Sequence, residues 1–423
     1  MIVSKECIKK MFVKILSGTF PADDSLSAGD SLSADDSLPI SGTLSANDSL
    51  SSDGSYYRLA APASNGKKID FLEVINVDVG DVDIDKIIMD DCIPYKSPKE
   101  FFFPRYEKLL SFCGEKVEAC KPERPFIIFG AKPCDLKALD TMSKIFTEGK
   151  FKDPFFTSHL ENNLLIGVSC QEKKEGCFCD RLSVDMNYSD KCDLFLESIE
   201  DDYRVLYVSD KGRDKFSPFI PELTYFENLS HPTTELPSEA DSLETPKLPT
   251  TSCAQKPQLK PVSLQVHGQT VLNTDDICIC NDQPLPLNET KLIDQINWEA
   301  IAETCQGCGL CTFICPTCHC FDFKDVEQNN ISSRYRIWDS CMYPRFTLHA
   351  SGHNPRESIA ERFRQRVLHK FVYVPQNIGE TACTGCGRCV RSCPAGMNIW
   401  QIVELIEPFL QQKSSAKRKE GSI

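Results

Sequence analysis

The hydrophobic residues of the chain follow helical periods in some segments and form short strand-like runs in others. Residues 1–15 are predicted to contain an amphipathic helix, because apolar residues recur there at the i, i+3, i+4, i+7 spacing. Those residues are Ile8, Met11, Phe12 and Ile15. Apolar runs that predict β-strands occur at 71–75, 126–129, 164–169 and 204–208.

A helical run lies between the second and third of these predicted strands. Asp135 to Phe146 places its apolar residues on one face, and Asp135 is the expected N-cap. Strand, helix and strand within about 45 residues predict a right-handed crossover between two parallel strands. We therefore predict an α/β domain over residues 56–230.

Two further helices are predicted in the last third of the chain. Asn354, Pro355 and Glu357 have the residue types of an N-cap, a first helical position and an acidic first turn. A buried helix face follows as far as Phe371, and another apolar face covers residues 399–406. These patterns predict a mostly helical domain over residues 291–412.

Three segments lack the pattern of a folded core. Residues 16–55 repeat Asp-Ser-Leu-Ser with too few apolar side chains to offset the entropy of ordering, and we interpret them as a disordered insertion. Residues 231–290 are rich in Pro, Thr and Ser and are predicted to be a linker or insertion. Residues 413–423 form a basic, frayed tail.

Composition adds one strong feature to this picture, because 23 of the 423 residues are cysteine. Lysines interrupt the only apolar stretch near the start, so no secretory signal is predicted. No apolar run approaches the ~18 residues of a membrane span. In the cytoplasmic location that this predicts, clustered cysteines are metal ligands more often than disulfides. The net charge of −14 argues against a nucleic-acid partner.

Eight of the cysteines form one motif that occurs twice. In each copy three cysteines are spaced by two residues, and a Cys-Pro follows after three more, as in bacterial iron–sulfur proteins. In two-cluster ferredoxins the fourth cysteine binds the other cluster. We therefore predict two 4Fe-4S clusters, with ligands Cys305, Cys308, Cys311 and Cys393 for one and Cys383, Cys386, Cys389 and Cys315 for the other. Structural zinc is the alternative, although zinc usually takes two spaced cysteine pairs.

A second group of cysteines lies in the predicted α/β domain. Cys134 and Cys170 each follow a predicted strand, and parallel strands end at the same edge of a sheet. Cys177 and Cys179 come shortly after and can return to that edge. A third cluster with these four ligands is one interpretation, and four buried structural cysteines are the other.

Two other groups have no assigned role. Cys318, Cys320 and Cys341 are three thiols with His319 as a further candidate ligand, and packing roles beside a cluster are an equal alternative. A basic region is interpreted as a solvated helix face, with a docking patch or an electrostatic brake on cluster charge as alternatives. Its members are Arg334, Arg336, Arg345, Arg356, Arg362, Arg364 and Arg366.

Several longer motifs accompany the cysteines and point to a known family. They lie at 98–104, 129–135, 153–156, 167–179, 336–341, 352–356, 361–366 and 369–371, beside both Cys-Pro motifs. With them the chain resembles the iron–sulfur beta subunits of sulfhydrogenases and is similar to the dicluster iron–sulfur subunit of anaerobic sulfite reductase. The resemblance implies an α+β protein, with an N-terminal α/β domain followed by a di-cluster domain of the alpha-helical ferredoxin type. It also favours the third cluster.

The function implied by this resemblance is electron transfer without catalysis. The chain would pass electrons one at a time between a reductase subunit that binds flavin and NAD(P) and a subunit of the hydrogenase, sulfite reductase or heterodisulfide reductase type. FAD and NAD(P) are expected on the partner only, since no glycine-rich dinucleotide motif is present here. A zinc-stabilised interaction scaffold without redox activity is the alternative function.

Overall fold

The computed structural model describes the chain in several stretches. These are residues 2–16, 58–64, 66–74, 84–89, 92–114, 116–120, 125–217, 264–266, 269–272, 296–328 and 331–411. The predicted Ser/Asp-rich insertion and the basic tail lie outside the described residues, apart from Leu16. The predicted linker lies outside them too, except for a short antiparallel pair of β10 (Leu264–Val266) and β11 (Gln269–Leu272).

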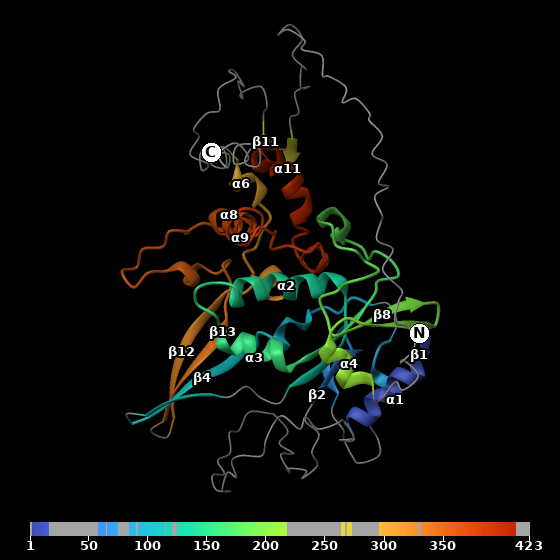
Figure 1. Cartoon of the computed structure of the whole chain (residues 1–423). Helices are drawn as coiled ribbons and strands as arrows, with labels where there is room; N and C mark the ends of the chain where they lie inside the picture. The colour runs from blue at the N-terminus through green and yellow to red at the C-terminus, as the bar shows by residue number, and fades with distance from the viewer. Residues whose placement is uncertain are drawn as a thin grey trace, which may run out of the picture.

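A mixed seven-stranded sheet lies below α2 (Pro133–Thr147) in the view of Figure 1. Its order is β1 (Ile2–Ser4), β9 (Asp202–Tyr207), β8 (Leu194–Ile199), β7 (Leu164–Val168), β6 (Phe126–Ala131), β2 (Arg58–Ser64) and β3 (Ile69–Val74). The four central strands β8, β7, β6 and β2 run parallel, and the outer strands pair antiparallel. The four predicted strands are therefore present as β3, β6, β7 and β9, and the predicted parallel pair is confirmed as β6 and β7.

Helices cover both faces of this sheet. On one side α1 (Lys5–Leu16) packs Ile8 and Phe12 into a core shared with Phe129 of β6. On the other side α2 (Pro133–Thr147) and α3 (Pro154–Asn162) bury Leu136, Met142 and Phe156. The short α4 (Asp210–Phe216) follows β9. The apolar faces predicted for the helices at 1–15 and 135–146 are therefore the buried faces of α1 and α2.

The start of α2 differs from the prediction. The N-cap is Lys132 rather than Asp135, so Cys134 lies in the first turn of the helix and not in the preceding turn. Asp135 occupies the third helical position and accepts a hydrogen bond from the backbone N–H of Lys132. The prediction was right that Asp135 lies at the start of the helix. The helix nevertheless begins earlier, at Pro133, because the fixed φ of proline suits the first helical position.

A second sheet, which the hydrophobic pattern did not predict, joins distant parts of the chain. It contains β12 (Phe321–Gln328), β13 (Ile331–Trp338), β4 (Tyr106–Cys113) and β5 (Lys116–Ala119), in that order and all antiparallel. Most of β12 and β5 is exposed, so these strands have no continuous apolar face that the sequence could reveal. The hairpin β12–β13 lies between the two cysteine motifs, so it inserts strands into the predicted helical domain and pairs them with the N-terminal half.

The remaining elements form the helical part of the molecule. They are α6 (Trp298–Ile301), α7 (Leu310–Phe313), α8 (Ile359–Leu368), a π-helix (His369–Tyr373), α9 (Val374–Ile378), α10 (Arg388–Arg391) and α11 (Ile399–Gln411). In Figure 1, α2 lies between these orange and red helices and the large sheet. Within the described residues, no helix is long and apolar enough to cross a membrane.

The start of α8 also corrects a prediction. Ser358 is the N-cap, and its hydroxyl and the Glu361 carboxylate exchange hydrogen bonds with each other's backbone N–H. Asn354 lies before the helix, where its side-chain oxygen accepts from the backbone of Arg356. The segment contains two possible helix starts, Asn-Pro-x-Glu at 354–357 and Ser-x-x-Glu at 358–361. The second forms the helix start, as a capping box. The residue before a proline is biased toward extended backbone, which is consistent with Asn354 lying outside the helix.

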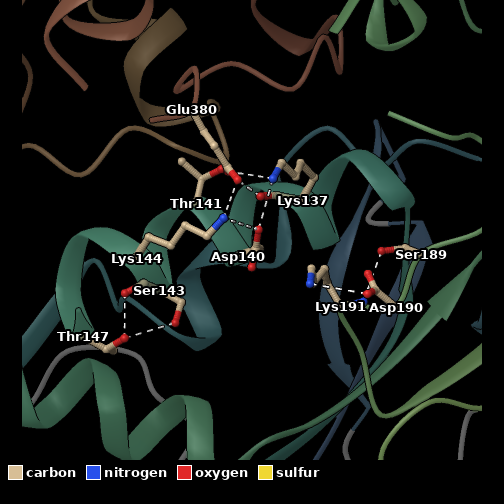
Figure 2. Close-up of polar contacts among 10 residues, drawn as sticks. All are labelled: Lys137, Asp140, Thr141, Ser143, Lys144, Thr147, Ser189, Asp190, Lys191 and Glu380. Carbon is tan, nitrogen blue, oxygen red and sulfur yellow. Dashed lines mark hydrogen bonds and ion pairs between the residues drawn. The ribbon is translucent and has the colours of Figure 1, made fainter. Parts of the chain in front are cut away.

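Ion pairs attach the segment before the second cysteine motif to α2. Figure 2 shows the Glu380 carboxylate between the ammonium groups of Lys137 and Lys144. The Lys137 Nζ to Glu380 Oε2 distance is 2.7 Å, and Asp140 contacts both lysines. Because Glu380 lies three residues before Cys383, these pairs fix the approach of the motif to the α/β part.

Candidate metal centres

The first candidate centre is a cavity between the two cysteine motifs, here called the first cavity. All four cysteines predicted for one cluster line it: Cys305, Cys308, Cys311 and Cys393. Gly309, at φ 75°, begins α7, and a Cβ there would lie 2.8 Å from the Tyr343 ring. Glycine is therefore required for the turn that brings the cysteines of this motif around one space. Phe363, Met342 and Met397 complete an apolar wall.

The second cavity is lined by the other predicted set. Cys315, Cys383, Cys386 and Cys389 surround it, together with Phe178 and Ile399. The motif turns at Gly385 and Gly387, both at positive φ. As in the first cavity, three cysteines come from one motif and the fourth from the other motif.

The third cavity lies at the edge of the large sheet and at the start of α2. Cys134, Cys170, Cys177 and Cys179 all line it, with Met186 and Val184. Cys170 follows β7, and Cys179 begins a 3₁₀ turn (Cys179–Leu182). The parallel pairing of β6 and β7 therefore brings together four cysteines spread over 46 positions of the sequence, from 134 to 179.

Neighbouring cavities share cysteines. Cys389 lines both the first and the second cavity, and Cys386 lines both the second and the third. The three cavities thus form a row, with the second cavity in the middle. Cys308 is exposed at the first cavity, whereas Cys386 in the middle is buried.

Close backbone packing holds the third cavity against the second. The Phe178 N–H donates to the Gly385 carbonyl oxygen over 2.8 Å. A Cβ at Gly385 would lie 2.4 Å from the backbone nitrogen of Cys179, so no other residue fits without moving one of the two loops. The Cys177 thiol is 3.4 Å from the Cys386 carbonyl oxygen, and Arg391 donates to that thiol over 3.2 Å.

Burial raises the pKa of several of these thiols and so keeps them protonated when no metal is bound. It raises the pKa of Cys383 and of Cys386 to about 12, and that of Cys311 to about 11. Cys315 differs, because a hydrogen bond from the Cys318 thiol and the nearby Lys370 ammonium lower its pKa well below the usual range. Metal binding at these cavities must therefore release protons.

A buried lysine, which the cysteine pattern could not reveal, faces the second cavity. Lys370 lies in the π-helical turn after α8 and is 3 % exposed. Its ammonium group donates to Cys315 Sγ over 3.1 Å and to Thr317 Oγ1 and the Ala382 carbonyl oxygen over 2.9 Å. Such π-turns are frequent at functional sites, and this one directs a cation at a candidate ligand.

The third group of cysteines lies beside the second cavity without lining it. In the described part of the chain, Cys318, Cys320 and Cys341 line none of the three cavities. The Cys318 carbonyl oxygen accepts from the buried Lys99 ammonium over 2.8 Å, and His319 Nδ1 lies 3.0 Å from the Thr317 carbonyl oxygen. This arrangement favours the packing role left open by the sequence.

The basic region is not a solvated helix face as a whole. Arg334 is exposed, but Arg336, Arg362 and Arg366 are all buried. Arg336 of β13 pairs with Glu107 of the neighbouring β4 and with Asp153, the N-cap of α3. The interpretation was wrong for these three. Arg336 lies on β13 and not on a helix, and helical spacing cannot distinguish whether Arg362 and Arg366 on α8 face solvent or a polar site inside the protein.

Comparison with known proteins supports the cysteine motifs directly. Residues 304–397 match the family of the 4Fe-4S dicluster domain, a range that contains all eight motif cysteines. This segment, here called the dicluster domain, is therefore similar to 4Fe-4S dicluster domains. The chain is also similar to sulfhydrogenase 2 subunit beta of Pyrococcus furiosus, with 26 % identity over 355 residues, which cover 84 % of this chain and 93 % of that protein. The resemblance to sulfhydrogenase beta subunits is thus confirmed, and no solved structure matches the chain.

The donor sets of the dicluster domain fit iron–sulfur clusters. Five thiols line the first cavity and four line the second, Cys389 being common to both, and no carboxylate is among the described residues that line either. In the described residues, no three His, Cys, Asp or Glu side chains converge closely enough to hold a single metal ion. The thiols of each set surround an open space instead of meeting at one point, and soft thiolate ligands select iron–sulfur clusters among other metals.

Proposed function

We propose that the chain is a non-catalytic electron-transfer subunit of a multi-subunit oxidoreductase, with three iron–sulfur clusters in a row. The observation that carries the proposal is the succession of three thiol-lined cavities in which each neighbouring pair shares a cysteine. Bound clusters of this kind accept and release one electron at a time. With four cysteine ligands at each cluster, no iron position is left open for a substrate.

The ligand assignment of the proposal follows the cavity linings. Cys305, Cys308, Cys311 and Cys393 would hold the first cluster, and Cys315, Cys383, Cys386 and Cys389 the second. The third would be held by Cys134, Cys170, Cys177 and Cys179. Apolar side chains form much of the wall of the first cavity, and Lys370 supplies a hydrogen bond and a positive charge at the second.

Zinc in these positions is disfavoured by the arrangement of the thiols. A structural zinc ion draws four sulfurs to within about 2.3 Å of one point. In the part of the chain that the structure describes, no three His, Cys, Asp or Glu side chains converge in that way. Thiols that surround a space favour a cofactor of several atoms over a single ion.

The expected partners follow from what this chain lacks and from its relative. The name of the Pyrococcus furiosus protein describes one subunit of a sulfhydrogenase. We infer that this chain likewise works beside a flavin- and NAD(P)-binding subunit, since its own sequence has no glycine-rich dinucleotide motif. A hydrogenase, sulfite reductase or heterodisulfide reductase subunit would be the other redox partner.

Iron analysis of anaerobically prepared protein tests the proposal. Two clusters correspond to about eight irons per chain and three to about twelve, with matching sulfide. We expect Cys308→Ser, Cys386→Ser and Cys170→Ser each to remove or alter a different EPR signal of the reduced protein. The matched control is Cys113→Ser, because Cys113 is an exposed cysteine outside all three cavities.

Three outcomes would change the conclusion. A colourless protein containing zinc would support the interaction scaffold instead. Four or fewer irons without a cluster signal on reduction would overturn the electron-transfer function. If the protein contains eight irons and Cys170→Ser does not change that number, electron transfer would be restricted to the dicluster domain. The four cysteines of the third cavity would then be structural.

A further inference from the structure

One buried arginine lacks the partners that the other buried arginines have. Among the described residues, Arg336, Arg362, Arg366 and Arg388 are buried, each at most 5 % exposed. Carboxylates pair with Arg336 and Arg388, and carbonyl oxygens of Met342, Arg356 and Glu357 accept from Arg362. Arg366 is the exception, because its Nε and Nη2 atoms are buried without any hydrogen-bond partner.

The position of Arg366 indicates what the missing partner is. Arg366 lies in the last turn of α8 and lines both the first and the second cavity. Phe363, one turn earlier on the same face, lines the first cavity. Although burial lowers the pKa of Arg366, the nearby thiols of Cys311 and Cys389 raise it well above the usual value.

An unpaired guanidinium group is costly inside a protein. Removing a charge from water costs several kcal/mol unless an opposite charge and hydrogen-bond acceptors replace the solvent. Carboxylate oxygens fill this role for Arg336 and Arg388, and carbonyl oxygens accept from Arg362. At Arg366 no oxygen of the described residues accepts from Nε or Nη2, and the residue lines the two thiol-lined cavities, which points to an anionic occupant in each.

We propose that Arg366 is a shared counter-charge for the two clusters of the dicluster domain, donating from Nε and Nη2 toward them and raising both reduction potentials. This inference rests on the proposed function and assigns a positioning role to a residue of this chain. A cluster with four thiolate ligands is an anion that gains one more negative charge on reduction. A fixed cation between two such anions therefore favours the reduced form of each and weakens their mutual repulsion.

Lys370 provides an internal comparison. It lines the second cavity but not the first, and its ammonium group contacts Cys315. Removing the Lys370 charge should lower the potential of the second cluster alone, whereas removing the Arg366 charge should lower both. This difference distinguishes a shared counter-charge from a general effect of losing one positive charge.

The test is an EPR-monitored redox titration of the complete, cluster-loaded protein. We expect Arg366→Met to reduce the equilibrium constant for reduction at least tenfold at both clusters, which is about 59 mV for a one-electron couple. The separation between the two midpoint potentials should widen. The Cys308→Ser and Cys386→Ser proteins assign the two signals.

Matched variants separate charge from packing. Arg366→Lys keeps the charge and should retain most of the wild-type potentials, whereas Arg366→Gln keeps a polar side chain without the charge and should behave like Arg366→Met. Arg364→Met is the control, because Arg364 is on α8 but lines neither of the two cavities. The Arg366→Met protein could fail to hold clusters. In that case the inference is supported if only the two dicluster signals are lost and Arg366→Lys restores both. It is overturned if Arg366→Lys does not restore them.

Failure of this inference differs from failure of the proposed function. If the wild-type protein binds no cluster, the proposed function fails and the counter-charge fails with it. If the wild-type protein gives both signals, and Arg366→Met and Arg366→Gln leave both midpoints unchanged, only the counter-charge is overturned. A shift confined to one cluster would also overturn the shared role.

Discussion

At the scale of single residues, Cys192 illustrates how burial alone changes a thiol in this protein. It lies just before β8 and packs against the core that contains Phe195. Burial raises the pKa of Cys192 to about 12 from the usual value of 9.0. The folded protein therefore holds this proton over a pH range in which the unfolded chain releases it.

We expect Cys192→Ala to reduce the loss of stability at alkaline pH. Between pH 9 and 12 the unfolded thiol is ionised and the folded thiol is not, so rising pH lowers the free energy of unfolding of the wild type. The slope for one proton is about 1.4 kcal/mol per pH unit, and the variant lacks this contribution. Urea unfolding of both proteins below and above pH 9 measures the difference, and parallel pH profiles would contradict the prediction.

At the scale of elements, α8 depends on its capping box. Ser358 Oγ accepts from the Glu361 N–H over 3.1 Å, and Glu361 Oε2 accepts from the Ser358 N–H over 2.8 Å. This helix carries Phe363 and Arg366, which line the candidate centres. A frayed first turn would therefore disturb the wall of the first cavity.

Ser358→Ala should lower the free energy of unfolding by about 1 kcal/mol, because one backbone N–H of α8 loses its acceptor. Ser351→Ala, in the exposed loop before the helix, is the control and should cost much less, because its hydroxyl accepts only a long, exposed hydrogen bond from the His353 N–H at 3.5 Å. Chemical unfolding followed by circular dichroism gives both values. Equal stability of the two variants would show that the capping box does not hold the helix start.

At the scale of the whole molecule, buried ion pairs join the α/β part to the dicluster domain. Asp135 of α2 and Arg388 of α10 are 253 positions apart in sequence, and both are fully buried or nearly so. Arg388 Nη2 donates to Asp135 Oδ2 over 2.9 Å, and Arg388 Nε donates to the Pro94 carbonyl oxygen. Since Cys134 and Cys386 are close to this pair in sequence, it fixes the third cavity against the second.

Arg388→Met should destabilise the protein by about 3–5 kcal/mol, because it leaves the Asp135 carboxylate buried without its partner. Adding Asp135→Asn should recover part of that loss, since the unpaired charge is then removed. Arg334→Met, which breaks an exposed pair with Asp325, is the surface control. The free energies from urea unfolding would contradict the prediction if Arg388→Met and Arg334→Met were equally stable.

Local patterns in the chain were sufficient for much of this architecture. Apolar periodicity located α1, α2, α8 and α11, because each helix buries one face. It missed β1, β2 and β8 of the large sheet and all four strands of the second sheet, of which β12 and β5 are mostly exposed. It also misplaced the starts of α2 and α8. Two competing capping signals in one segment cannot be ranked without the contacts that satisfy them.

The sequence by itself was enough to predict the eight cysteines of the dicluster motifs as ligands and their crossed pairing, since fixed spacing on a loop limits which thiols can surround one cofactor. The tertiary structure alone decided the row of three cavities, the burial of Arg366 and the contact of Lys370 with Cys315. The reason is physical. Ligand spacing is a property of neighbouring residues, whereas burial and charge compensation depend on which distant segments the fold brings together.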